Sequence, residues 1–171
     1  QRWFSIPQSP LLAREDHVMV WNGEVVVIWG GRHAVGLRGD GAIFSPTQNH
    51  WSSIPEPGAP LARSGATGVW TGNQLIVWGG RLGLGDAGDG GRLSIPQGAP
   101  MSWQSITRNG ALSPRQGHSA VWTGGRMIVW GGISGTTLLD DGASYDPVTD
   151  QWSRVSRIDA PSARKGHNAI W

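Results

Sequence analysis

The chain of 171 residues corresponds to one ordinary domain, and it carries 27 glycines, 11 prolines and 11 tryptophans. So much glycine argues against a helix bundle, because each interior glycine costs a helix ~1 kcal/mol, while the apolar runs beside the tryptophans argue against disorder. The absence of cysteine excludes disulfides and thiolate chemistry, and a net charge of +2 without a basic run argues against nucleic-acid binding.

In chain order, the sequence is a repeat array. Four segments align without gaps, at residues 14–21, 63–70, 115–122 and 164–171. The first three continue through a turn into an apolar run that ends in Trp-Gly-Gly, and an aspartate follows nine residues after the second glycine. We therefore predict a single domain over residues 1–171, with units at about 14–62, 63–114 and 115–163 and partial units at 1–13 and 164–171. The second unit is longer, and its extra residues lie between Asp89 and Trp103.

Each unit is predicted to form four short strands. Residues 119–122 and their equivalents form the first strand, and Gly-containing pairs such as 22–23 then make a tight turn. The second strand, such as residues 75–78, is apolar throughout, which indicates burial on both faces. A proline ends the third strand, and the fourth, such as residues 152–155, alternates as an outer strand does. No apolar run is long enough for a membrane span.

A unit that is apolar on both faces must stack against copies of itself, and radial stacking produces a β-propeller. The Gly-Gly pair, the aromatic residue beyond it, the later tryptophan and a period of about 50 residues resemble kelch repeats. The chain is similar to bacterial-type kelch proteins and to the central domain of galactose oxidase more than to animal adaptor kelch proteins. The bacterial style favours a secreted or extracytoplasmic location.

This resemblance implies an all-β kelch-type β-propeller. We expect three complete four-stranded blades plus a lone strand at each end, at residues 3–6 and 164–171, as part of a ring of six or seven blades. An array with two open ends would expose apolar faces. We therefore expect either additional blades, with the polypeptide continuing beyond both ends, or self-association through the open propeller ends.

The candidate binding surface is the rim that carries the loops between second and third strands, at residues 32–39, 81–88 and 133–140. The connections between units at residues 7–13, 55–62 and 107–114 lie on the same rim and belong to this surface. These loops vary between units, and function on a repeat scaffold usually resides in variable loops of one face. The predicted ligand-binding residues are cations in or beside the first two loops: Arg32, His33, Arg38, Arg81 and Arg92. They would suit carboxylate or sulfate groups, whereas the alternative is that they are solvated charges without a ligand.

Residues that recur in every unit are predicted to be structural. The four arginines that begin the aligned segments are expected to pair with a neighbouring blade, the alternative being an anion-binding ring. The histidines at 17, 118 and 167 are expected to be hydrogen-bonded core residues, because Ala66 interrupts any metal-binding ring. Each aspartate before the third strand is expected to cap its own turn, with calcium binding as the alternative.

No complete catalytic constellation is present. The chain lacks a Gly-x-Ser-x-Gly elbow, and with no cysteine and only Tyr145 it cannot build the copper-radical site of galactose oxidase. The sequence favours a non-catalytic binding or scaffold module whose ligand is a protein or a glycan, with no catalytic residue, metal or cofactor. The alternative is part of a carbohydrate-active kelch enzyme such as a sugar mutarotase.

Overall fold

The computed structural model describes residues 5–171, which form three four-stranded antiparallel sheets and contain no helix. The first blade consists of β1 (Val18–Trp21), β2 (Val26–Trp29), β5 (Gly41–Ser45) and β6 (His50–Ser53). The second consists of β7 (Thr67–Trp70), β8 (Gln74–Trp78), β11 (Gly90–Ser94) and β12 (Ser102–Ser105). The third consists of β13 (Ser119–Trp122), β14 (Met127–Trp130), β17 (Gly142–Asp146) and β18 (Gln151–Arg154). The all-β prediction and the four-strand units are therefore confirmed.

Local sequence explains why these strands form. The turn between β1 and β2 closes because the side chain of Asn22 accepts hydrogen bonds from the amides of Glu24 and Val25, while Gly23 takes a φ of 101°. β8 is buried from Leu75 to Trp78, as a strand covered on both faces should be. The outer strand β18 buries only its tryptophan, in agreement with the predicted alternation.

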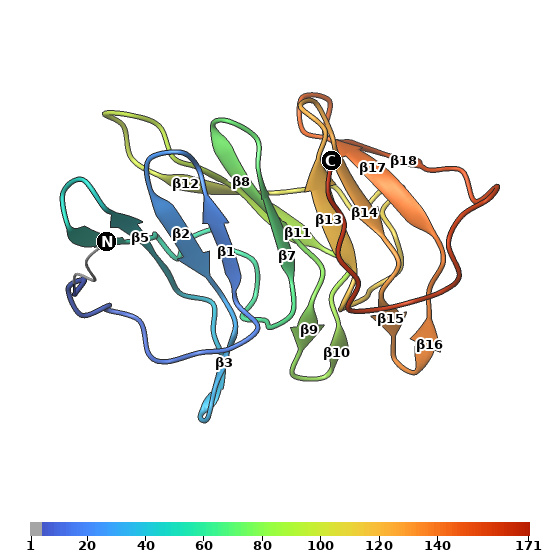
Figure 1. Ribbon diagram of the computed structural model, residues 1–171, viewed down its shortest axis with the longest axis horizontal. Coiled ribbons are helices and arrows are strands. Elements are labelled where there is room, and N and C mark those ends of the chain that lie inside the picture. The colour runs from blue at the N-terminus through green and yellow to red at the C-terminus, as the bar shows by residue number, and fades with distance from the viewer. Residues whose placement is uncertain (1–4) are drawn as a thin grey trace.

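The core lies between the blades, which stand side by side in Figure 1. Between the first and second blades, the rings of Trp29 and Trp103 lie 5.5 Å apart. Between the second and third blades, Trp78 and Trp152 repeat this contact at 5.4 Å. Each pair joins the end of a second strand to the outer strand of the next blade, so the recurring tryptophans hold neighbouring blades together.

Each loop between second and third strands contains a small hairpin that the sequence did not predict. The hairpins are β3 (Arg32–His33) with β4 (Gly36–Leu37), β9 (Arg81–Leu82) with β10 (Gly85–Asp86), and β15 (Ile133–Ser134) with β16 (Thr137–Leu138). All three project from one end of the blades, at the lower edge of Figure 1. We call this surface the hairpin rim. The periodicity signal fails here because each strand has only two residues.

The prediction of a lone strand at each end is not confirmed. Residues 164–171 lie alongside β13 in Figure 1, and the Gly166 amide donates to the Gly117 carbonyl at 2.8 Å, but they form no strand. Within the described residues, no strand pairs with this segment in a ladder. At the other end, residues 5 and 6 are outside any strand, and the first half of the predicted strand lies outside the described residues.

The described residues form no closed ring, so the outer face of the first blade is open. Trp70 and Trp122 pack against the inter-blade cores, whereas Trp21 at the same position is 55% exposed. No helix in residues 5–171 is long and apolar enough to cross a membrane.

Candidate functional site

Three of the four recurring arginines, Arg14, Arg63 and Arg115, form clasps with an aspartate of their own blade. Arg63 is fully buried, and its guanidinium donates to the carbonyls of Leu61, Gly79 and Asp89 at 2.9–3.1 Å. It also pairs with the Asp89 carboxylate at 2.8 Å. The clasp thus ties the entrance of β7 to the end of β8 and the start of β11. A fully buried guanidinium needs such partners, because an unpaired buried charge is costly.

The same clasp recurs in the other blades, between Arg14 and Asp40 at 2.9 Å and between Arg115 and Asp141 at 2.7 Å. Burial alone would raise the pKa of Asp40, but hydrogen bonds from Arg14 and Arg38 outweigh it and lower the pKa to about 2. Each of these aspartates is thus bound to an arginine of its own blade, a contact that the sequence did not predict, and their turn-capping role stays a prediction. Sequence reasoning missed their partners because each arginine lies 26 residues away along the chain.

The backbones of these arginines join adjacent blades. The Gly31 amide of the first blade donates to the Arg63 carbonyl at 2.8 Å, and the Arg63 amide donates to the Arg38 carbonyl at 3.0 Å. Equivalent bonds place Arg115 against the second blade. The predicted structural role that reaches a neighbouring blade is confirmed for Arg63 and Arg115. In each case the side chain bonds within its own blade, and the backbone bonds to the preceding blade.

The histidines are also structural. The Nε2 atom of His118 lies 2.8 Å from the Thr67 hydroxyl of the preceding blade, and its ring stands edge-on to Trp78. His167 repeats the contact with Ser119 at 2.9 Å. Burial lowers the pKa of His118 to about 3, and the charge of Arg115 is a smaller cause. The predicted hydrogen-bonded role is confirmed for His118 and His167, and it stays a prediction for His17. Residues 5–171 hold no cluster of three or more metal-ligating side chains.

Four of the five predicted ligand-binding residues lie on or beside the hairpin rim. Arg32 and His33 form β3, Arg38 follows β4, and Arg81 begins β9. The charge of Arg32 is offset by Glu15 and Asp16, at 3.1 and 3.2 Å. That of Arg38 is offset by Asp40 at 3.1 Å. Arg81 is exposed and pairs with no carboxylate of the described chain.

Arg92 lies apart from the other four. It belongs to β11, pairs across the sheet with Ile76 and Gln104, and faces the third blade. Its guanidinium donates to the carbonyl of Pro147 at 2.5 Å and to the side chain of Gln104 at 3.2 Å. The structure therefore does not bring Arg92 to the hairpin rim.

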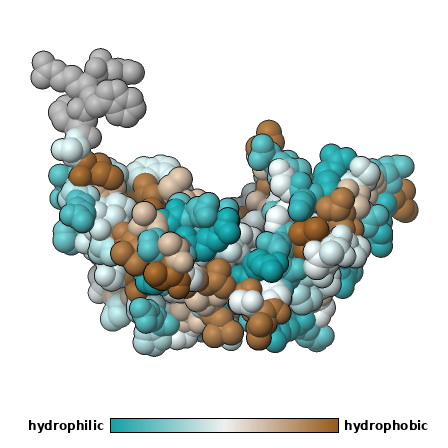
Figure 2. Space-filling model, turned by 90° about the horizontal axis from the view of Figure 1, so that it is seen from below, coloured by the Kyte–Doolittle hydropathy of each residue, from teal (hydrophilic) through white to brown (hydrophobic). Residues whose placement is uncertain are grey.

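The hairpin rim exposes apolar side chains at its tips. Val35 is 77% exposed and Leu84 is fully exposed, and both occupy the second position of a two-residue turn. Leu138 on β16 is also exposed, and the Gly135 amide donates to the Asp86 carboxylate at 2.8 Å, which joins two of the hairpins. Figure 2 looks toward this side of the molecule and shows apolar patches scattered among hydrophilic ones. Turns normally carry glycine or small polar residues, so apolar tips require another explanation.

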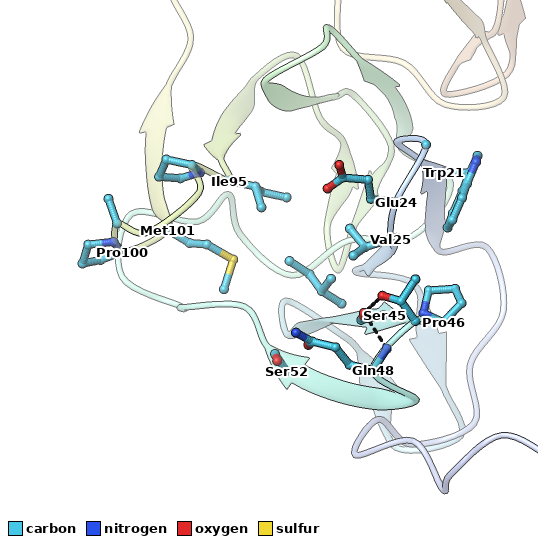
Figure 3. A pocket seen from close by; sticks show the side chains of 15 residues that line it. Trp21, Glu24, Val25, Ser45, Pro46, Gln48, Ser52, Ile95, Pro100 and Met101 are labelled. Atoms are coloured by element: carbon cyan, nitrogen blue, oxygen red, sulfur yellow. Dashed lines mark hydrogen bonds between the residues drawn. The ribbon is translucent and has the colours of Figure 1, made fainter.

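A groove of about 840 Å³ lies on the opposite rim, between the first and second blades. Figure 3 shows its walls: Trp21, Glu24 and Gln48 come from the first blade, and Ile95, Pro100 and Met101 come from the second. We call it the first inter-blade groove. Sequence reasoning placed function on the other rim and missed it, although the extra residues before Trp103 were a signal, because part of that longer segment builds one wall.

The sequence of residues 4–171 matches the KLHDC2/KLHL20/DRC7 Kelch-repeats domain family. Because the match covers nearly the whole chain, the protein belongs to the kelch-repeat family, whose propellers are generally protein-binding domains. The predicted kelch family is confirmed, while the finer resemblance to bacterial-type repeats and to the galactose oxidase domain stays a prediction. No curated protein matches the chain.

Proposed function

We propose that the chain is a non-catalytic protein-binding module and that the hairpin rim is its contact surface. The observation that carries this proposal is the pair of exposed apolar tips, Val35 and Leu84, on adjacent hairpins. Burying an apolar side chain of this size against a partner contributes ~1.5–3 kcal/mol. The clasp arginines, their aspartates and His118 are bonded to other groups of the chain itself. These recurring ionisable residues thus have a structural role, which supports the non-catalytic part of the proposal.

A selection for binding peptides tests this proposal. The chain is used to select binders from a displayed library of random peptides, and affinities are then measured for the wild type and for Val35→Ser combined with Leu84→Ser. We expect the double variant to lose at least about tenfold in affinity with an unchanged melting temperature. Val148→Ser is the matched control, because Val148 is 91% exposed but lies in a turn of the opposite rim. Equal affinity for the double variant and the wild type would contradict the proposal.

Among the predicted arginines of the hairpin rim, Arg81 is best placed to bind an anionic group of a partner, because Arg32 and Arg38 are already paired with carboxylates. A partner that presents a carboxylate or sulfate beside its apolar side chain would suit this position. Arg81→Ala should then weaken only acidic binders, and a glycan array distinguishes an acidic sugar from an acidic peptide. Turnover of any bound sugar would support the carbohydrate-active enzyme instead.

We also propose that a further blade or a second copy of the chain covers the outer face of the first blade. Met19 is 63% exposed on this face, and Trp21, at the edge between this face and the first inter-blade groove, is 55% exposed. Ala120 and Trp122, the equivalents in the third blade, pack against an inter-blade core. Light scattering of the 171-residue chain tests self-association. A monomer that stays soluble at every concentration would contradict a second copy.

A further inference from the structure

The rim opposite the hairpins has two inter-blade grooves, and they differ in size and in the side chains that cross between the blades. The second groove, between the second and third blades, is small at about 300 Å³ and includes Pro147. Arg92 reaches this edge from the second blade and donates to the Pro147 carbonyl, with the Gln104 side chain as its other acceptor. The guanidinium of the chain itself therefore bridges the two blades there.

The first inter-blade groove lacks this built-in arginine. Ile43 occupies the position of Arg92, as shown by its pairing with Val27, the counterpart of Ile76. Ser52 pairs with Ile43 across the sheet, where the second blade has Gln104 opposite Arg92. Isoleucine is too short to cross to the next blade, so the first groove stays open at about 840 Å³.

The acceptors for a guanidinium nevertheless remain. Ile95 directly follows β11, as Pro147 directly follows β17, so the two residues are equivalent. Ile95, Pro96 and Ser52 all line the first groove. A carboxylate is added: Glu24 lines this groove, at the position where the second and third units have the neutral Asn73 and Gly125. Glu24 is the one charged residue among those that line it.

The other walls suit the stem of a long side chain. Ile43 is buried at 8% exposure, and Val25, Ile95 and Met101 are half-buried around the groove. An arginine stem packs along apolar surface while its head group stays with polar partners. A guanidinium beside Glu24 would gain a charge-assisted hydrogen bond, which is about twice as strong as a neutral one.

The geometry points to the first inter-blade groove as a docking site for an arginine side chain of a peptide segment from a protein partner. The incoming arginine takes the place that Arg92 fills in the second groove, with its stem over Ile43 and its guanidinium between Glu24 and the edge of the second blade. This inference does not depend on the hairpin rim, because the groove lies on the opposite side of the blades.

The probe is the blocked tripeptide acetyl-Leu-Arg-Leu-amide, titrated into the full chain labelled with ¹⁵N. We expect amide shifts centred on Ser52, Ile95 and Met101, and the citrulline analogue, which is neutral, should bind about tenfold more weakly. Shifts centred on the hairpin rim, no shifts up to the solubility limit of the peptide, or equal binding of both peptides would overturn the proposal.

Variants separate this site from general charge attraction. Glu24→Gln should weaken binding about fivefold to tenfold, whereas Glu56→Gln, an exposed glutamate near the hairpin rim, should have no effect. Ile43→Arg copies the second groove and should abolish binding, because the chain then supplies its own guanidinium. If Ile43→Arg fails to fold, the citrulline comparison and Glu24→Gln still decide. An unchanged affinity in Glu24→Gln would overturn the proposal.

Discussion

Arg115→Met measures what a buried clasp contributes to stability. The guanidinium of Arg115 is fully buried and donates to the carbonyls of Ser113 and Gly131 and to the Asp141 carboxylate, the last at 2.7 Å. Methionine keeps most of the apolar stem and removes the charge and the donors. Removing one partner of a buried ion pair costs ~3–5 kcal/mol, because the other charge is left uncompensated.

The lower end of this range applies here. The Asp141 side chain is 25% exposed, and Arg154, which lies 3.3 Å from its carboxylate, is not removed by the substitution. We therefore expect a loss of about 3 kcal/mol in the free energy of unfolding. Urea titration followed by tryptophan fluorescence measures this loss, and an unchanged m-value shows that the two states are otherwise comparable.

Arg164→Met is the matched control. Arg164 has the same position in the repeat, but it is exposed, and its side chain bonds only to Ser162 within the described chain. Its replacement should change the unfolding free energy by less than about 0.5 kcal/mol. If Arg115→Met loses no more than Arg164→Met, the clasp makes no net contribution and its proposed structural role is refuted.

Two further predictions concern contacts between blades. Burial holds the pKa of His118 at about 3, whereas the same side chain in the unfolded chain has a pKa near 6.5. Between these pH values only the unfolded chain binds the proton, so the free energy of unfolding should fall as the pH drops from about 6.5 toward 3. The fall should be smaller in His118→Gln, and equal pH profiles by urea titration would contradict the assignment. A Cβ on Gly68 would lie 2.3 Å from Cγ1 of Val18, so Gly68→Ala should cost ~1–3 kcal/mol. Gly83→Ala, which meets no atom within 4 Å, should leave the melting temperature unchanged, and equal melting temperatures for the two variants would refute the argument from blade spacing.

Strand positions were predictable because the repeat signals are local. An apolar run before Trp-Gly-Gly and an alternating run after a proline each indicate a strand of a defined type, and the structure places β8 and β18 accordingly. The lone strand at residues 164–171 failed for a physical reason. A strand needs a hydrogen-bonded ladder with a partner strand, and none of the strands of residues 5–171 pairs with this segment.

The candidate site was less predictable. The five predicted cations share only their nearness to the variable loops in the sequence. Their surroundings in space show that carboxylates pair with Arg32 and Arg38 and that Arg92 bridges two blades. The first inter-blade groove depends on a substitution of isoleucine for arginine at one position of the repeat. The effect of this difference is visible only in the tertiary structure, where the side chain at this position faces the next blade.

The sequence by itself determined the kelch family and the three four-stranded units, because a pattern that repeats along the chain shows which positions of each unit are apolar. Tertiary structure decided which charges face which. Arg115 and Asp141 are 26 residues apart and meet only because β13, β14 and β17 fold into one sheet. His118 and Thr67 meet only because two blades stack. Such pairings arise from the relative placement of sheets, which no local pattern encodes.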